Sequence, residues 1–262
     1  MNLEKICAEL NGIVISTGNY IVEQRKAFSK DVVEIKALNQ LVSYVDINAE
    51  KQLVEQLSIL LPEAGFITEE NTSDKGSKAY NWIIDPLDGT TNFIHDVPVY
   101  SISVALAKGE EILVGVVYEL GRKELFTAWK NGGAWLNGQP IRVSGENTLS
   151  KSLIATGFPY YDFQQMDAYI NVLKELLKST HGLRRMGSAA VDMAYVACGR
   201  FEGFFEYGLH AWDIAAGILL VKEAGGQVVD FKGGDDYLFG ETIISGNAYI
   251  HKDLLKLIKS EF

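Results

Sequence analysis

Two aspartates stand close together in the segment WIIDPLDGTTNF, which spans residues 82–93. The apolar residues before Asp85 predict a buried strand, and Pro86 keeps Asp85 out of a helical conformation. Ligand sites in α/β proteins gather where strands end. Two carboxylates brought together by a turn repel one another, and a hard divalent cation such as Mg²⁺, which takes oxygen ligands, removes that repulsion. Asp85 and Asp88 are therefore candidate metal ligands.

The same segment has other interpretations. An Asx turn that caps a helix would also place an aspartate before glycine and threonine. A calcium loop of the EF-hand type requires glycine at its sixth position and glutamate at its twelfth. Counted from Asp85, Gly89 is fifth and Asp96 is twelfth, so the EF-hand loop fails and the Asx turn stays open.

Other acidic residues sit in similar places. Glu69 and Glu70 follow a short apolar run, and Asp213 stands beside Trp212 at the start of a helix with few charges. A carboxylate there is ordinary as a helix cap, but it is costly in a core without a partner. The small residues 215–217 would let this helix approach another backbone closely.

The turn Gly89-Thr90-Thr91 adds a candidate anion site. The first N–H groups of a helix lack intrahelical acceptors, and a helix start attracts phosphate. Metal-binding acids beside such a helix start describe a site for phosphoryl hydrolysis, in which two metal ions would stabilise the attacking and the leaving oxygen.

Composition limits the class of protein. The chain has 262 residues, 47% of them hydrophobic and 22% charged, as expected for a globular protein with an ample core. A formal charge of −10 disfavours a basic nucleic-acid surface. No apolar run approaches the ~20 residues of a membrane helix, and the N-terminus resembles an amphipathic helix rather than a signal peptide. We expect a cytoplasmic protein without a membrane segment.

The expected elements fall into two halves. Helical spacing covers residues 1–27 and 46–60, and residues 82–143 alternate short apolar runs with hairpin turn signals, which predicts a largely antiparallel sheet. After about residue 150, strands and helices alternate, which predicts an α/β half covered by helices. Because no linker separates the halves, we interpret residues 1–262 as one domain with subdomains 1–148 and 149–262.

The motifs DPLDGTTNF, TEE and WDIAAG together resemble the inositol monophosphatase family of Mg²⁺-dependent, lithium-sensitive phosphatases. The likeness runs from the N-terminal helix to TIISGN and the closing helix, nearly the whole chain. It implies the layered αβαβα sandwich of the sugar phosphatases, a homodimer, and about two or three Mg²⁺ ions in each active site. The implied reaction is hydrolysis of inositol monophosphate to inositol and phosphate by in-line attack of a metal-activated water.

The resemblance also implies roles for individual residues. The metal ligands would be Glu69, Asp85, Asp88 and Asp213, with the Leu87 carbonyl. Thr90 and Asp46 would orient the attacking water, which Glu69 would also touch. The substrate-binding residues would be Asp88, Gly89, Thr90, Ala189, Glu206 and Asp213, of which Gly89 and Thr90 would bind phosphate through their amides and Glu206 would bind a substrate hydroxyl.

Some positions stay without an assigned role. Family members vary across the segment 157–165, so no hydroxyl-binding residue is transferred to it. The pair Arg184-Arg185 could reach a second phosphate, but a solvated strand end is the simpler interpretation. For His95 we favour a surface or helix-dipole role over metal binding, because histidine is a softer ligand than Mg²⁺ prefers.

Competing functions stay open. Thr91 and Asn92 follow Asp88-Gly89-Thr90 where enzymes for 3′-phosphoadenosine 5′-phosphate usually have Lys-Glu, which favours inositol phosphates or similar polyol phosphates. A fructose-1,6-bisphosphatase or a broader sugar or polyol phosphatase is the main alternative. A catalytically silent interaction protein is the alternative from another class, and a binding role beside catalysis stays open.

Overall fold

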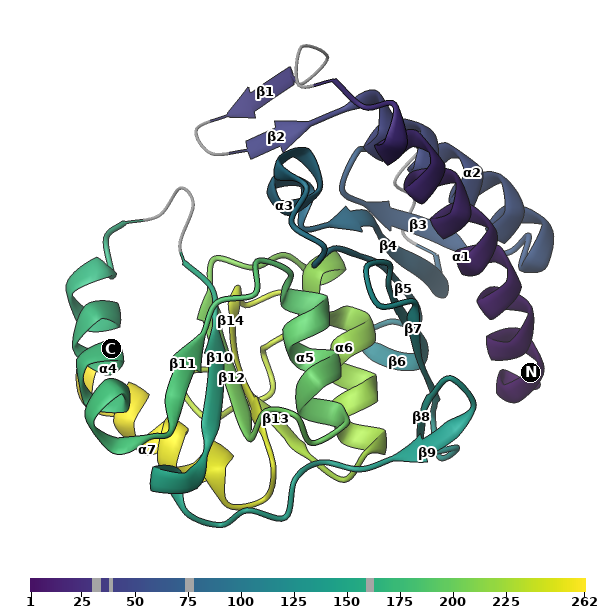
Figure 1. Cartoon of the computed structure of the whole chain (residues 1–262). Coiled ribbons are helices and arrows are strands. Elements are labelled where there is room, and N and C mark those ends of the chain that lie inside the picture. The colour runs from purple at the N-terminus through teal and green to yellow at the C-terminus, as the bar shows by residue number, and fades with distance from the viewer. Residues whose placement is uncertain (30–33, 38–39, 74–77, 159–162) are drawn as a thin grey trace.

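The computed structural model describes residues 1–29, 34–37, 40–73, 78–158 and 163–262, which form alternating layers of helices and sheets (Figure 1). The helices are α1 (Leu3–Lys26), α2 (Tyr44–Leu60), α3 (Thr90–His95), α4 (Met166–Ser179), α5 (Ala189–Ala197), α6 (Ala211–Glu223), α7 (Ile250–Glu261) and the 3₁₀ helix η2 (Leu149–Lys151). The strands are β1 (Glu34–Ala37), β2 (Gln40–Val42), β3 (Gly65–Thr68), β4 (Tyr80–Asp88), β5 (Ser101–Lys108), β6 (Glu111–Glu119), β7 (Glu124–Trp129), β8 (Ala134–Leu136), β9 (Gln139–Ile141), β10 (Leu153–Thr156), β11 (Gly182–Arg184), β12 (Gly203–Tyr207), β13 (Gln227–Val229) and β14 (Thr242–Gly246).

The first large sheet has the order β3-β4-β5-β6-β7-β8-β9 in the described part of the chain. Every neighbouring pair from β4 to β9 is antiparallel, as the hairpin signals predict, whereas β3 lies parallel to β4. Asn131, Asn137 and Gly138 have positive φ values of 62°, 49° and 77°, which the turns between these strands require. Helix α2 leads into β3, and residues 69–79 connect β3 to its parallel neighbour β4.

Helices α1 and α2 cover one face of this sheet (Figure 1). The buried residues of α1 recur at the spacing of one helical face: Cys7, Leu10, Val14, Thr17, Gly18 and Ile21. They pack with the buried side of α2 and with inward residues of β4, such as Trp82 and Ile84.

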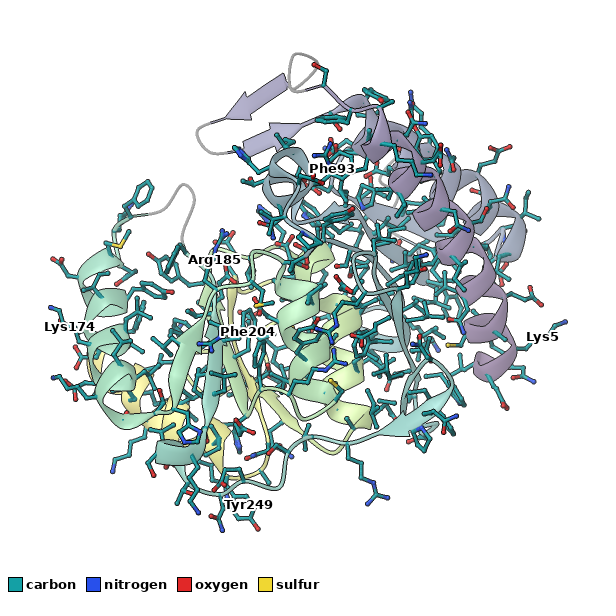
Figure 2. All side chains as sticks on the ribbon, viewed as in Figure 1. Lys5, Phe93, Lys174, Arg185, Phe204 and Tyr249 are labelled. Atoms are coloured by element: carbon teal, nitrogen blue, oxygen red, sulfur yellow. The ribbon has the colours of Figure 1, made fainter. Side chains whose placement is uncertain are left out.

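Helices α5 and α6 fill the middle layer between the two large sheets. Every residue of α5 is buried, and α6 is buried from Ile214 to Val221. A helix that is apolar all round must be covered on every side, and here the sheets provide that cover. Figure 2 shows Phe204 of β12 in this interior, whereas Lys5 and Lys174 point outward.

The second large sheet has the order β11-β10-β12-β14-β13 among the described strands. Strands β11, β10 and β12 are parallel, and β14 runs antiparallel to β12. Helices α4 and α7 cover its outer face through Tyr169, Val172, Leu254 and Ile258. The layers therefore follow the order α, β, α, β, α, which confirms the expected sandwich.

Among the described residues, no helix combines the length and the apolar character needed to cross a bilayer.

Candidate active site

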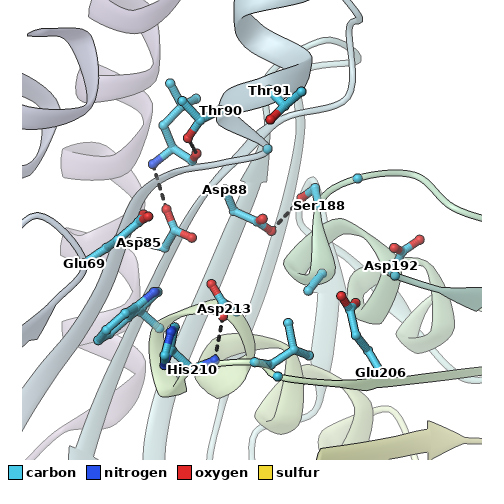
Figure 3. Close-up of a pocket in the computed structure, with 18 of the residues that line it drawn as sticks. Glu69, Asp85, Asp88, Thr90, Thr91, Ser188, Asp192, Glu206, His210 and Asp213 are labelled. Atoms are coloured by element: carbon cyan, nitrogen blue, oxygen red, sulfur yellow. Dashed lines mark hydrogen bonds between the residues drawn. The ribbon is translucent and has the colours of Figure 1, made fainter. Parts of the chain in front are cut away.

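A cavity of about 360 Å³ gathers the ends of β3, β4 and β12 and the starts of α3, α5 and α6 (Figure 3). Its lining residues are Glu69, Asn71, Asp85, Leu87, Asp88, Gly89, Thr90, Thr91, Gly157, Arg185, Gly187, Ser188, Ala189, Asp192, Glu206, Gly208, Leu209, His210, Trp212 and Asp213. Both halves of the chain contribute to it, so the site exists only when the two halves pack together.

Strand β4 carries two of the acids. The sequence predicts that the strand ends near Asp85, but it continues to Asp88. In a regular strand, residues three positions apart point to opposite faces. The pairing of β4 with β5 is irregular between Asp85 and Asp88, and this irregularity lets both carboxylates line the same cavity. Asp85 is 2% exposed and accepts the Leu87 N–H at 2.9 Å. Pro86 has no N–H to offer to the ladder at this point.

Asp88 joins the end of β4 to the start of α5. Its carboxylate accepts the Ser188 hydroxyl at 2.6 Å and the Ala190 N–H at 2.8 Å. Ser188 is also the N-cap of α5, where it accepts the Val191 N–H. Burial raises the pKa of Asp88 to about 6, although these hydrogen bonds oppose the rise.

Asp213 lies in the first turn of α6 and accepts the His210 N–H at 2.6 Å. The N-cap of α6 is His210 and not Asp213, which is the third helical residue and accepts the N–H of the cap residue; the same carboxylate also lines the cavity. Burial raises the pKa of Asp213 well above its ordinary value, and the charge of Asp88 raises it further.

The acidic cluster is electrostatically unfavourable in the absence of a cation. Burial raises the pKa of Asp85 well above its ordinary value, and the charges of Glu69, Asp88 and Asp213 raise it further, in that order. A cation among these groups would favour their ionised forms and lower the pKa values again.

The donor set fits a hard divalent cation. Carboxylates of Glu69, Asp85, Asp88 and Asp213 and the carbonyl of Leu87 are the oxygen ligands that Mg²⁺ prefers. Within the part of the chain that the structure describes, no three acidic, histidine or cysteine side chains already have the mutual spacing of a metal cage. Three of the carboxylates each direct one oxygen to a hydrogen-bond donor of the protein instead, as Figure 3 shows. The chemistry of the donors and their mutual repulsion support the fit.

The start of α3 lies beside these acids. Gly89 is its N-cap, with φ of 96°, and a side chain there would meet the Val99 carbonyl oxygen at 3.0 Å. Glycine is therefore required both by the backbone conformation and by the close approach. The predicted turn and helix start are confirmed, and the first N–H groups of α3 have no acceptor within that helix.

Asp46 of α2 contacts this turn through the Thr90 hydroxyl. The Thr90 hydroxyl lies 3.0 Å from a carboxylate oxygen of Asp46 and 3.1 Å from the Leu87 carbonyl oxygen, and it donates to one of them. Asp46 is fully buried in the first turn of α2, where it also accepts the N–H and hydroxyl of Ser43. Burial raises its pKa, and these bonds oppose the rise. Asp46 does not line the cavity, and its contact with the lining residue Thr90 connects it to the site.

The opposite wall of the cavity carries Glu206 and Ala189. Burial raises the pKa of Glu206 to about 8, because the opposing charge of Arg185 only partly compensates. A side chain at Gly157 would overlap the Glu206 carboxylate at 1.9 Å, so glycine there makes room for this acid. The part of segment 157–165 that spans residues 159–162 lies outside the described residues.

Two charged lining residues, Arg185 and Asp192, differ from the sequence interpretation or are absent from it. Arg184 lies exposed at the end of β11, as the solvated interpretation of the arginine pair states, but Arg185 lines the cavity and lies 5.6 Å from the Phe158 ring. Asp192 of α5 is 1% exposed, and burial raises its pKa well above the ordinary value, helped by the charge of Glu206. A lone acid in an apolar helix was the available signal for Asp192.

All the residues predicted for the site except Asp46 line this one cavity. His95 is an exposed residue at the end of α3 and is not among the lining residues, which agrees with a surface role. Acids that can hold a cation, helix-start amides without an acceptor in their own helix, and a polar wall thus surround one space. Such a space can bind a phosphate ester with its phosphate at the acids and its organic part against Glu206.

Comparisons with known proteins agree with this geometry. The model of the inositol monophosphatase family matches residues 2–261. The chain is 42% identical to the inositol-1-monophosphatase of Mesorhizobium japonicum, across 87% of this chain and 86% of that protein. It is also 42% identical to the Nus factor SuhB of Escherichia coli, across 93% and 92% of the two chains. The solved structure of inositol monophosphatase from Anabaena is similar with a TM-score of 0.87 and 30% identity, and covers 100% of this chain and 98% of its own.

Proposed function

This chain belongs to the inositol monophosphatase family and is a phosphatase, and from that premise we propose that it is a Mg²⁺-dependent phosphomonoesterase that releases phosphate from inositol monophosphate. The observation that supports this most is the convergence of Glu69, Asp85, Asp88 and Asp213 on the cavity that also contains the start of α3. A homodimer, as the family resemblance implies, is part of the proposal.

The phosphate would bind where the acids and the start of α3 meet. Glu69, Asp85, Asp88, Asp213 and the Leu87 carbonyl would hold about two or three Mg²⁺ ions. When bound, these ions supply charge neutralisation, acidification of water and stabilisation of the leaving oxygen. The amides of Gly89 and Thr90 would donate hydrogen bonds to phosphate oxygens.

Thr90 and Asp46 would orient the attacking water. The hydroxyl proton of Thr90 is held toward Asp46 or the Leu87 carbonyl, which leaves the lone pairs of the hydroxyl oxygen as acceptors for a water proton. Glu69 would accept the second proton of that water. Two acceptors fix the water with its oxygen toward phosphorus, which is the arrangement that in-line attack requires.

Glu206 and Ala189 would position the organic part of the substrate. Burial raises the pKa of Glu206 to about 8, which favours the protonated carboxyl group at neutral pH, and a protonated carboxyl group can donate or accept a hydrogen bond. A polyol hydroxyl can do both as well. This match favours a polyol phosphate over a substrate whose leaving group is apolar.

The proposal is tested by substrate and metal dependence together. We expect Mg²⁺-dependent, Li⁺-inhibited phosphate release that is fastest with inositol 1-phosphate, compared with fructose 1,6-bisphosphate and 3′-phosphoadenosine 5′-phosphate. Asp85→Asn and Asp213→Asn should each lower the activity by more than about 100-fold, because loss of a ligand costs more than loss of an outer partner. Asp253→Asn, which changes an exposed aspartate of α7, is the matched control.

Two results would contradict the proposal. Near-normal activity in Asp85→Asn or Asp213→Asn would exclude the acidic cluster as the metal site. Preference for another of the three substrates would keep the metal chemistry but replace inositol phosphate as the substrate.

A second candidate function comes from the relatives. Several proteins at 42–45% identity, including that of Escherichia coli, bear the name Nus factor SuhB. The role that this name states is therefore a candidate for this chain too. We place it second because every acid expected of the phosphatase except Asp46 lines the cavity, and Asp46 contacts the lining residue Thr90. Absence of phosphate release from all three substrates with Mg²⁺ would make it the leading candidate.

A further inference from the structure

Glu50 of α2 holds the loop that follows β3. One oxygen of its carboxylate accepts the Glu70 N–H at 2.7 Å. The other accepts both the N–H and the hydroxyl of Thr72 at 2.8 Å. Three hydrogen bonds from one buried side chain therefore reach the segment that begins with Glu69.

The position of Glu50 on its helix connects this loop to the rest of the site. Asp46 and Glu50 are one turn apart on the same face of α2, and both are fully buried. Asp46 contacts Thr90 at the start of α3, whereas Glu50 contacts the loop after β3. One rigid helix thus sets the relative position of the two segments that border the acidic cluster.

Further hydrogen bonds hold residues 69–73, the described start of this loop. The Glu69 N–H continues the parallel pairing by donating to the Ile84 carbonyl at 3.3 Å. Asn71 then adopts a positive φ of 55° and donates its side-chain amide to the Glu69 carbonyl at 3.2 Å. Glu50 accepts the backbone N–H groups on either side of Asn71, those of Glu70 and Thr72.

We propose that Glu50 is a positioning residue that keeps the Glu69 carboxylate directed at the acidic cluster, and that it thereby sets the metal affinity of the site. The effect on metal affinity rests on the proposed function, which supplies the metal ions. The hydrogen bonds between Glu50 and the loop do not depend on that proposal. Both Glu50 oxygens already accept donors of the protein, so the residue acts through the loop and not on the substrate. The charge matters as well, since a carboxylate can accept at both oxygens whereas an amide cannot.

Glu50→Gln is the direct test, because it keeps the size of the side chain and turns an NH₂ group toward an N–H donor. In metal-free protein, hydrogen exchange at the amides of Glu70 and Thr72 should become at least about tenfold faster. Mn²⁺ affinity measured by electron paramagnetic resonance, and the Mg²⁺ concentration that gives half-maximal activity, should each weaken about 10-fold to 100-fold. The kcat at saturating Mg²⁺ should stay within about threefold.

Glu55→Gln is the matched control, because Glu55 is an exposed acid on the same helix. It should leave amide exchange, Mn²⁺ affinity and Mg²⁺ requirement unchanged. If Glu50→Gln fails to fold, the variants Thr72→Val and Thr72→Ser test the positioning role instead. Both keep the backbone N–H bond to Glu50, but only the serine keeps the hydroxyl bond. We expect Mn²⁺ affinity to fall about 2-fold to 5-fold in the valine variant and to be retained in the serine variant.

The outcomes separate this inference from the proposed function. If the wild-type protein binds Mn²⁺ and releases phosphate while Glu50→Gln matches it in exchange and affinity, the positioning role is wrong and the phosphatase proposal stands. Equal affinities in the two Thr72 variants would also overturn the positioning role. If the wild-type protein releases no phosphate, the proposed function is wrong, and the exchange measurement still decides whether Glu50 tethers the loop.

Discussion

Glu206 is a buried acid that lines the cavity opposite the acidic cluster. It is 6% exposed, and burial raises its pKa to about 8 despite the nearby charge of Arg185. In the unfolded chain the same group has its ordinary pKa of 4.5. Between these two values the unfolded chain is ionised while the folded protein holds a proton, so the free energy of unfolding decreases as pH rises.

Replacement by glutamine should remove this pH dependence. The stabilising effect of Glu206 is fully present below pH 4.5 and is lost as pH rises through about 8. Relative to the wild type, Glu206→Gln should therefore gain up to about 1.4 kcal/mol of unfolding free energy per pH unit between pH 5 and pH 8. Urea unfolding with EDTA present, at pH 6 and at pH 8, measures the difference.

Glu55→Gln provides the comparison for an exposed carboxylate. A difference between Glu206→Gln and wild type that is the same at both pH values would show that the raised pKa is wrong.

The sequence identifies several residues of the site, but it does not show how neighbouring side chains are oriented. Asp85, Asp88 and Asp213 are recognisable because each follows or begins an apolar element, and all three reach the cavity. Asp192 is instead a lone acid inside the apolar helix α5, and only the packing of this helix reveals that its side chain lines the cavity. Neighbouring residues of an extended run, such as Arg184 and Arg185, point to opposite sides, but the sequence does not say which of the two sides faces the cavity.

At the scale of elements, small residues determine how closely α6 approaches its neighbours. A side chain at Gly115 of β6 would meet the Ala216 carbonyl oxygen at 2.9 Å, and one at Gly217 would meet the Met193 Cβ at 2.7 Å. The prediction that residues 215–217 permit close packing is therefore confirmed. Since Asp213 lies on the same helix, this packing also places a candidate metal ligand.

Gly115→Ala should destabilise the protein, because the new methyl group would press on a backbone carbonyl that cannot rotate away. We expect a loss of about 1–3 kcal/mol in the free energy of unfolding, measured by urea titration, with weaker Mn²⁺ binding as α6 shifts. Gly12→Ala makes the same chemical change on α1, where nothing lies within 4 Å. It should stabilise by about 0.5–1 kcal/mol, and a loss at Gly12 as large as that at Gly115 would contradict the packing argument.

The elements themselves follow closely from periodicity and turn chemistry. The helix predicted over 46–60 begins at Tyr44, two residues earlier, because Ser43 serves as its N-cap. Strand β4 continues through Asp85 to Asp88 instead of ending near Asp85, because an irregular pairing with β5 accommodates Pro86. Irregularities of this kind depend on the partner strand, so the sequence of one strand cannot reveal them.

At the scale of the whole molecule, the order of the layers depends on contacts between distant segments. Local patterns indicate which elements are buried on one side and which on all sides. They do not say that α5 and α6, which are apolar all round, lie between two separate sheets. The family resemblance supplied that order, since it reflects the fold of the entire chain.

The middle layer joins the two expected subdomains through a shared core. One cluster of buried residues includes Ile83 and Phe126 of the first sheet together with Phe204 and Ile243 of the second. Polar contacts cross the same boundary: Arg200, after α5, bonds to both carboxylate oxygens of Glu124 in β7, at 2.5 Å and 2.7 Å. Neither half can expose its inner face without breaking this core, so residues 1–148 and 149–262 should not unfold separately.

We expect the whole chain to unfold in urea in a single cooperative transition. Many chains longer than about 150 residues unfold through intermediates instead, so this result is informative. Fluorescence reports on Trp82, Trp129 and Trp135 in the first sheet and on Trp212 in α6, whereas far-UV circular dichroism reports on helices of every layer. The two signals should give coincident urea curves, and the calorimetric and van't Hoff enthalpies should agree. Separate midpoints, or a fragment of residues 149–262 that folds by itself, would show two independent domains whose interface forms the cavity only after each has folded.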